Sequence, residues 1–295
     1  MKLEQACRFA LEVTGYGISA SSEGFSEKNK TNLENAFNDG LNPTFDKVGS
    51  CIMEVKTSGE DVFLALCTMR SDMSSRSARK TIFTNAVCMP IELYRQVIST
   101  HPEIILSLRA DQFLSSQPGI QLLPQYELNE EVPQMNLDYL RERWELDRRD
   151  YADFLYKIYY AMLSGGTVCI DTAADFGKAI PIVQEFAYCA LRGILPCMRE
   201  RITFSSARDA RNVISIASDA GGSWNMEGLE FYHFAAEKKE RSAADYPAQD
   251  PVNDREMVWL ICEEIATRED HERENFLNQL EQWIGQLTQI GRAHV

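Results

Sequence analysis

The chain has 295 residues, of which 44% are hydrophobic and 25% charged, so it can bury the core of one large domain or two ordinary ones. Its formal net charge of −14 repels phosphate backbones, which argues against nucleic acid as a general partner. The segment after Met1 lacks the long apolar core of a signal peptide, and no apolar run is as long as a membrane span. We therefore expect a cytoplasmic protein without a transmembrane segment.

The first forty residues predict strands followed by a helix. Residues 5–20 are rich in strand formers, and Gly15 and Gly17 interrupt them. Ser26 is suited to cap a helix over 27–38, in which apolar residues at i, i+4 spacing share one face.

A β-hairpin and a third strand are expected next. Residues 50–57 and 61–69 are β-like apolar runs separated by a short Ser-Gly-Glu turn. A strand over 81–89 is expected to pair with this hairpin. A helix then begins at Pro90, since proline is favoured in a first helical turn.

Residues 101–135 have several prolines and no regular period, which makes them the best internal boundary. Helices are predicted over 136–147 and 150–163. The second helix is expected to stop at Gly165, because glycine favours the end of a helix.

An alternating order of strands and helices follows. We predict a buried strand at 167–171, a helix at 178–193, strands at 201–205 and 212–217, and a further strand at 231–234. The strand–helix–strand order predicts a βαβ unit with a right-handed crossover. The fold class is therefore expected to be α+β, with a mixed sheet, β-hairpins and a βαβ unit, in one composite body.

The remaining chain is interpreted as a linker and a helical region. Residues 236–254 are charged and rich in Ala, Asp and Pro, as in a linker. Helices are predicted at about 255–267 and 270–288. This divides the chain into an N-terminal α+β domain, 1–235, and the truncated start of a helical middle domain, 255–289.

The last six residues, 290–295, can be back-translated as ATC GGA AGA GCA CAC GTC, the start of a widely used sequencing adapter. We interpret this tail as read-through into adapter, which predicts that the natural chain continues beyond Gln289. A longer read of the same locus that encodes the same tail would contradict this interpretation.

The eight cysteines form no CxxC pair and no Cys/His spacing suited to zinc. We expect buried free thiols in a reducing compartment, and no cofactor or metal site. The alternative is nucleophilic or acid–base chemistry, which needs a base beside a thiol or a carboxylate at a strand end. The candidates for it are Cys88 or Cys169 with His101 or His233, and the carboxylates Asp171 and Asp175.

One basic loop stands out in this acidic chain. This loop between predicted strands could bind an acidic partner or a phosphate, while solvent-facing charge is the simpler interpretation. Its candidate partner-binding residues are Arg70, Arg76, Arg79 and Lys80. Two further candidates, Arg199 and Arg201, lie in a helix-to-strand connection, and their functional weight comes only from the family resemblance given next.

Four short segments carry motifs. They are Glu4-Gln5-Ala6 leading to Gly15-Tyr16-Gly17 and Ser22-Glu23-Gly24, the strand Thr81–Pro90, the strand Thr167–Asp171, and Leu195-Pro196 leading to Thr203-Phe204-Ser205. Together they resemble the N-terminal region of bacterial GTPase-associated proteins, which are large multidomain proteins encoded beside GTPase-like genes in predicted conflict or defence loci. Asn85 stands where the family's corresponding strand has His.

The resemblance covers about residues 4–235, and the helical region from 255 would begin the family's middle domain. It implies a non-enzymatic adaptor that acts with a GTPase system, and it assigns no catalytic residue. We therefore expect a protein partner, such as a GTPase encoded nearby. The alternatives are a cysteine- or carboxylate-dependent hydrolase with an α/β cleft, and a small-molecule or nucleotide-signal sensor.

Overall fold

The computed structural model describes residues 1–11, 15–38, 51–71, 80–109, 122–128, 136–172, 176–207, 212–218, 230–241 and 254–293. The described strands are β1 (Lys2–Leu11), β2 (Gly15–Ser22), β3 (Cys51–Ser58), β4 (Asp61–Ser71), β5 (Lys80–Pro90), β6 (Leu122–Leu123), β7 (Tyr126–Glu127), β8 (Thr167–Thr172), β9 (Phe204–Ser205), β10 (Ile214–Ser218) and β11 (Phe231–Ala235).

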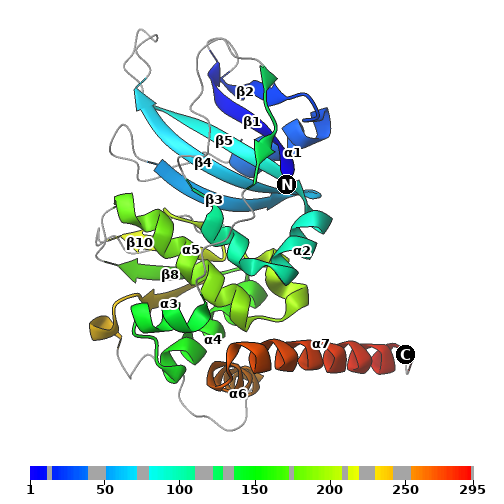
Figure 1. Ribbon diagram of the computed structural model, residues 1–295, viewed down its shortest axis with the longest axis vertical. Coiled ribbons are helices and arrows are strands. Elements are labelled where there is room, and N and C mark those ends of the chain that lie inside the picture. The colour runs from blue at the N-terminus through cyan, green and yellow to red at the C-terminus, as the bar shows by residue number, and fades with distance from the viewer. Residues whose placement is uncertain are drawn as a thin grey trace.

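Helices cover both faces of the sheet that these strands form (Figure 1). The α-helices are α1 (Glu27–Asn38), α2 (Ile91–Thr100), α3 (Leu137–Arg143), α4 (Arg148–Ser164), α5 (Phe176–Gly193), α6 (Asp254–Thr267) and α7 (Asp270–Ala293). Short 3-10 helices are η1 (Pro102–Ser107), η3 (Pro196–Arg201) and η4 (Lys238–Glu240). The predicted α+β class with a mixed sheet is confirmed.

The N-terminal strands form an antiparallel region. The predicted hairpin is confirmed, because β3 and β4 pair from Cys51 opposite Thr68 to Ser58 opposite Asp61. β5 pairs with β4 and β1, and β2 pairs with β1. Side chains alternate between the two faces of these strands, so Met53 lies in the main core and the adjacent Ile52 in a second core beneath α1.

The C-terminal strands form a parallel region, in the order β11-β8-β10-β9. Helix α5 connects β8 to β9, so the predicted βαβ unit is confirmed. The strand predicted at 201–205 is only two residues long, because Pro196 starts η3 and this turn of helix occupies the chain as far as Arg201.

A two-residue strand joins the two regions into one sheet. β9 pairs in parallel with β10 and antiparallel with β3. Next to it, Ser206 N–H donates to the Met53 carbonyl at 2.9 Å, and the Ser206 hydroxyl accepts from Met53 N–H at 2.9 Å. The sheet order over the described strands is therefore continuous, β11-β8-β10-β9-β3-β4-β5-β1-β2-β6, with β7 paired to β1.

The helices begin and end where local chemistry favours it. Ser26 caps α1 as predicted, since its hydroxyl accepts from Asn29 N–H at 3.2 Å, and Asn29 Oδ1 accepts from Ser26 N–H at 3.0 Å. Asp147 and Asp150 form a capping box at the start of α4. Gly165 ends that helix in the left-handed region, at φ 74°, as predicted.

The C-terminal helices pack on the body. Helix α6 packs against α4 and contributes Trp259, Cys262 and Ile265 to the main core, and α7 contributes Leu277 to the same core. Beyond this contact α7 extends away from the sheet (Figure 1). None of the helices in the described ranges is long and apolar enough to cross a membrane.

Candidate functional site

The carboxyl ends of β8 and β11 meet at one edge of the parallel region, where α/β sheets commonly place ligand-binding groups. On this edge His233 Nδ1 lies 3.0 Å from Asp171 Oδ2. Both side chains are partly exposed. Burial raises the pKa of Asp171 above its ordinary value, although the neighbouring His233 opposes that rise.

Cys169 lies next to this pair. It is opposite His233 in the parallel register, and it shares a sheet face with Asp171 because the two are two residues apart on β8. Its side chain is fully buried. The structure therefore brings together three residues that the sequence suggested for nucleophilic chemistry, with an oriented histidine but a thiol that has no access to solvent.

The other residues suggested for this chemistry lie elsewhere. Burial, with Asp61 nearby, raises the pKa of the Cys88 thiol, which makes it a poor nucleophile. His101 lies at the exposed end of α2, with its Nδ1 3.3 Å from Glu103 Oε1. Asp175 lies outside the described residues.

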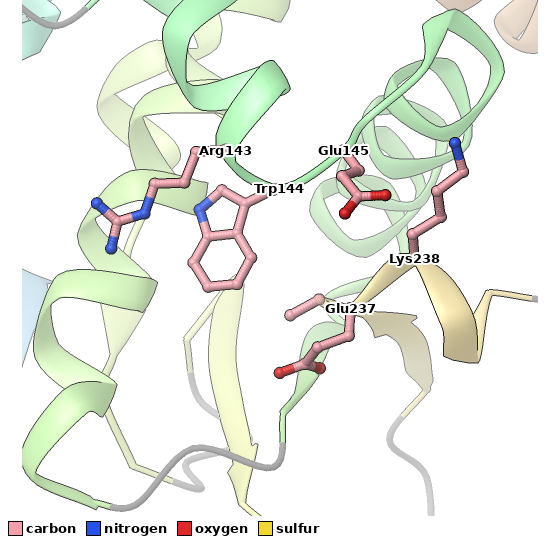
Figure 2. A pocket seen from close by; sticks show the side chains of 6 residues that line it. Arg143, Trp144, Glu145, Glu237 and Lys238 are labelled. Carbon is pink, nitrogen blue, oxygen red and sulfur yellow. The ribbon is translucent and has the colours of Figure 1, made fainter.

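A pocket of about 500 Å³ lies next to the carboxyl end of β11. Figure 2 shows its lining side chains, which come from the end of α3 with the turn that follows it, and from the segment after β11. They are Arg143, Trp144, Glu145, Ala236, Glu237 and Lys238.

Arg241 holds the two walls of this pocket together. Its guanidinium donates to the carbonyls of Trp144 at 2.6 Å and Glu145 at 3.0 Å on one wall, and to that of Ala235 at 3.0 Å on the other. It also pairs with the buried Asp150 carboxylate at 3.0 Å. A buried charge is stable only when its donors are satisfied, and here one side chain meets that condition by bridging distant segments.

The indole of Trp144 is held by two neighbouring residues of α5. Its Nε1 donates to Glu185 Oε2 at 2.8 Å, and its ring packs against Phe186 with 5.3 Å between centroids. Arg143 also pairs with Glu185, at 3.1 Å. Burial raises the pKa of Glu185, although Trp144 and Arg143 both act to lower it.

The basic loop predicted to bind a partner spans the ends of a hairpin. Arg70 is in β4 opposite Thr81, and Ser71 is opposite Lys80 at the start of β5. Arg76 and Arg79, and the side chains of Arg70 and Lys80, lie outside the described residues. Their role in partner binding remains a prediction.

Arg199, the other basic candidate, lies inside the protein. Its side chain is 0% exposed, and it donates to both carboxylate oxygens of Glu274, at 2.8 and 2.9 Å, and to the Ser99 carbonyl at 3.0 Å. The structure thus gives Arg199 an internal role, because it joins η3 to α7 instead of facing an external partner. Arg201 is exposed and donates to the Met162 carbonyl at 2.9 Å.

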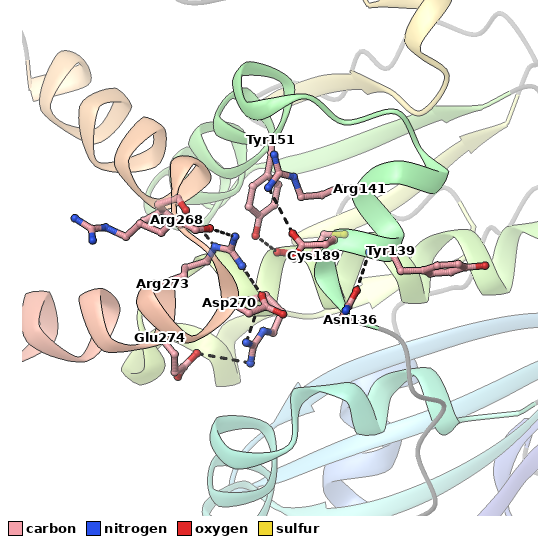
Figure 3. A network of polar contacts seen from close by, with 12 residues as sticks. Asn136, Tyr139, Arg141, Tyr151, Cys189, Arg268, Asp270, Arg273 and Glu274 are labelled. Carbon is pink, nitrogen blue, oxygen red and sulfur yellow. Dashed lines mark hydrogen bonds and ion pairs between the residues drawn. The ribbon is translucent and has the colours of Figure 1, made fainter.

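Further arginines strengthen the contact between α7 and the body (Figure 3). Arg273 pairs with Asp270 at 2.6 Å, and Arg192 of α5 lies 3.5 Å from Asp270. Arg192 is also 3.7 Å from Glu274. These pairs are partly or fully buried, so they fix the direction in which α7 leaves the body.

The motifs that carry the family resemblance have internal roles. Gln5 Nε2 donates to the Pro124 carbonyl at 2.7 Å, and Gln5 N–H donates to the Ser22 hydroxyl at 2.9 Å. In the last motif, the Ser205 hydroxyl donates to the buried Glu54 carboxylate at 3.0 Å. Asn85, at the position of the expected His, is 1% exposed. These residues hold strands together and are not gathered at one site.

The sequence did not suggest the pocket residues. Trp144 was within a predicted helix, and Glu237, Lys238 and Arg241 were in the predicted linker. Two features of the pocket are visible in the sequence: a tryptophan near the end of a predicted helix and an arginine in a polar stretch. Neither indicates a partner 90 or more residues away, so only the fold brings these segments together.

No group of three or more His, Cys, Asp or Glu residues in the described ranges is arranged to hold a metal ion. Comparisons of the chain with family models, with curated proteins and with solved structures found no match.

Proposed function

We propose that this chain is a cytoplasmic adaptor module of a bacterial GTPase-associated multidomain protein in a conflict or defence system, and that it binds the GTPase encoded beside it. The sequence motifs described above support the family assignment. The side chains of these motifs form hydrogen bonds that hold strands together. The resemblance is therefore one of fold and not of a catalytic site, as expected for a module that binds and does not catalyse.

The observation that carries the proposal is the apolar face of α7. Trp283 is 57% exposed and Ile284 is 45% exposed, in the C-terminal half of α7. Large apolar side chains exposed together on one surface are typical of protein-binding sites. The adjacent Gln282 and Gln286 are exposed and uncharged, so a partner helix or groove that covers these two side chains buries no charge on them.

The anchored base of α7 supports the same function. Arg199 and Arg192 hold Glu274, near the start of the helix, while Trp283 lies more than two turns further along. A helix fixed at one end presents its exposed side chains in a constant direction. Such pre-organisation lowers the entropy cost of binding.

Binding of the purified chain to the purified neighbouring GTPase tests the proposal, with the GTPase loaded with GDP or with a non-hydrolysable GTP analogue. We expect saturable binding in one nucleotide state, and at least about a tenfold loss of affinity for the double variant Trp283→Gln/Ile284→Gln. The matched control is Leu163→Gln on α4, which removes an apolar side chain that is 66% exposed outside this face and should leave the affinity unchanged.

Two outcomes would overturn the proposal. One is that the chain, shown by circular dichroism to be folded, binds the GTPase in neither nucleotide state. The other is equal binding by wild type and the double variant, which would place the contact elsewhere and remove the observation on which the proposal rests.

A cysteine hydrolase is the second candidate, because the Asp171–His233 hydrogen bond lies beside Cys169. It ranks below the adaptor because the thiol is fully buried. Alkylation by iodoacetamide, followed by mass spectrometry, decides it: an active nucleophile must react faster than the buried Cys262, and must slow in His233→Asn. Equal rates at the two cysteines would eliminate this candidate.

A further inference from the structure

The pocket beside β11 has a rigid aromatic wall. The hydrogen bond from Trp144 to Glu185 and the contact with Phe186 hold the indole in place, and Arg241 holds the backbone of Trp144. Arg143 Cζ lies 5.8 Å from the centroid of the Trp144 ring, and the rest of the flat, immobile surface, in a pocket of about 500 Å³, suits a planar or apolar group of side-chain size.

The charges around the pocket are unequal. Arg143 is neutralised by Glu185, at 3.1 Å. Within the described part of the chain, Glu145, Glu237 and Lys238 form no ion pair, which leaves two carboxylates against one ammonium group. In Figure 2 the carboxylates of Glu145 and Glu237 lie on either side of the space beside Trp144, and the end of Lys238 points away from Glu237.

Glu237 is the more informative of the two carboxylates. Its Oε1 accepts from the Thr172 hydroxyl at 3.0 Å. Its Oε2 is buried and has no hydrogen-bond partner among the described residues. A carboxylate that is partly removed from water and has only a neutral donor is costly, and a cation in the pocket would offset that cost.

We propose that this pocket binds the guanidinium group of an arginine side chain on a peptide segment of a partner protein. The planar guanidinium stacks on Trp144 and donates to the carboxylates of Glu145 and Glu237. Arginine fits better than lysine because its group is flat, carries five donors in a fixed fork and is less strongly hydrated. The chain's net charge of −14 favours the approach of a basic segment.

Titration of the full chain with Nα-acetyl-arginine amide tests this inference, with the indole N–H signal of Trp144 followed by NMR. We expect saturable binding in the millimolar range. The neutral isostere Nα-acetyl-citrulline amide should bind at least about tenfold more weakly, because it keeps the shape and loses the charge.

Two variants at exposed positions test whether the pocket binds a cation or an anion. Glu145→Gln should weaken arginine binding by about fivefold, and Lys238→Ala should strengthen it by about twofold to fivefold. An anion-binding pocket would show the opposite signs, and would respond to Nα-acetyl-glutamate amide. Any one of three results would overturn the inference: this anion-binding behaviour, equal binding of the arginine and citrulline amides, or no saturable change in the indole N–H signal of Trp144. The α7 face is not involved, so a failure here leaves the GTPase proposal intact.

Discussion

At the scale of the residue, several ionisable groups lie where water does not reach them. Glu185 is one: its side chain is 5% exposed, and it accepts from Trp144 while pairing with Arg143. Burial nevertheless outweighs both partners and raises the pKa of this carboxyl above its ordinary value of 4.5. The charged form of Glu185 is therefore less stable in the folded protein than in the unfolded chain.

The variant Glu185→Gln tests this balance. The folded protein holds the Glu185 proton more tightly than the unfolded chain does. The charged carboxylate therefore destabilises the folded protein in full above the folded pKa, and this destabilisation is lost as the pH falls through that pKa toward 4.5. We expect Gln to raise the free energy of unfolding at pH 7 by at most about 1 kcal/mol, allowing for solvent screening from the open pocket. The gain should disappear near pH 4.

Urea unfolding at both pH values measures the effect. Glu142→Gln, at an exposed position in the same helix-end region, is the matched control and should change stability by less than about 0.5 kcal/mol. A loss of stability in Glu185→Gln at pH 7 that shrinks at low pH would mean that the pair with Arg143 outweighs burial.

At the scale of the element, two helical glycines illustrate how the surrounding atoms decide whether a substitution stabilises or destabilises the protein. Gly193 ends α5 against α4, and a Cβ there would overlap Leu155 and lie 2.7 Å from the Tyr151 hydroxyl. That hydroxyl is already bonded to the Cys189 carbonyl at 2.7 Å. Gly285 is in the exposed part of α7, where a Cβ would meet no atom within 4 Å.

We expect Gly193→Ala to destabilise the protein by about 1–3 kcal/mol, because the added methyl group forces two packed side chains to move. Gly285→Ala should stabilise α7 by up to about 1 kcal/mol, since alanine loses less backbone entropy in a helix. Urea unfolding measures the first effect and far-UV circular dichroism the second. Equal effects of the two substitutions would mean that α4 and α5 are not in close contact.

At the scale of the whole molecule, β9 is the joint between the antiparallel and parallel parts of the sheet. Ser205 is fully buried there, and its hydroxyl donates to Glu54 Oε1 at 3.0 Å and accepts from Ala207 N–H at 3.2 Å. Glu54 is 1% exposed. The joint therefore depends on polar contacts between residues about 150 positions apart in the chain.

Ser205→Ala should lower the free energy of unfolding by about 1–3 kcal/mol, because a buried carboxylate oxygen loses a donor. Since the sheet is continuous, we expect a single transition in which tryptophan fluorescence and far-UV circular dichroism coincide. Thr31→Ala, at an exposed hydroxyl on α1, is the control and should change stability by less than about 0.5 kcal/mol. Two separate transitions would show that the two parts fold independently.

The sequence by itself determined most of the elements. The cap at Ser26, the hairpin around Gly59 and the stop at Gly165 were predicted because each depends on neighbours within a few residues. The βαβ order was predicted because each of its elements has a local pattern of its own. Alternation of apolar side chains and glycine punctuation are local signals. Buried free thiols were expected from the apolar runs around the cysteines; six of the eight are buried, while Cys51 is partly exposed and Cys197 is exposed.

Only the tertiary structure decided how the parts join and where a site forms. β9 is too short to have a period, Arg199 has the same local sequence whether it faces outward or is buried, and the pocket combines a turn near Trp144 with a segment near Glu237. These arrangements depend on hydrogen bonds and ion pairs between residues tens to more than a hundred positions apart. Their free energy is gained only when the whole sheet has formed, so no local pattern reports it.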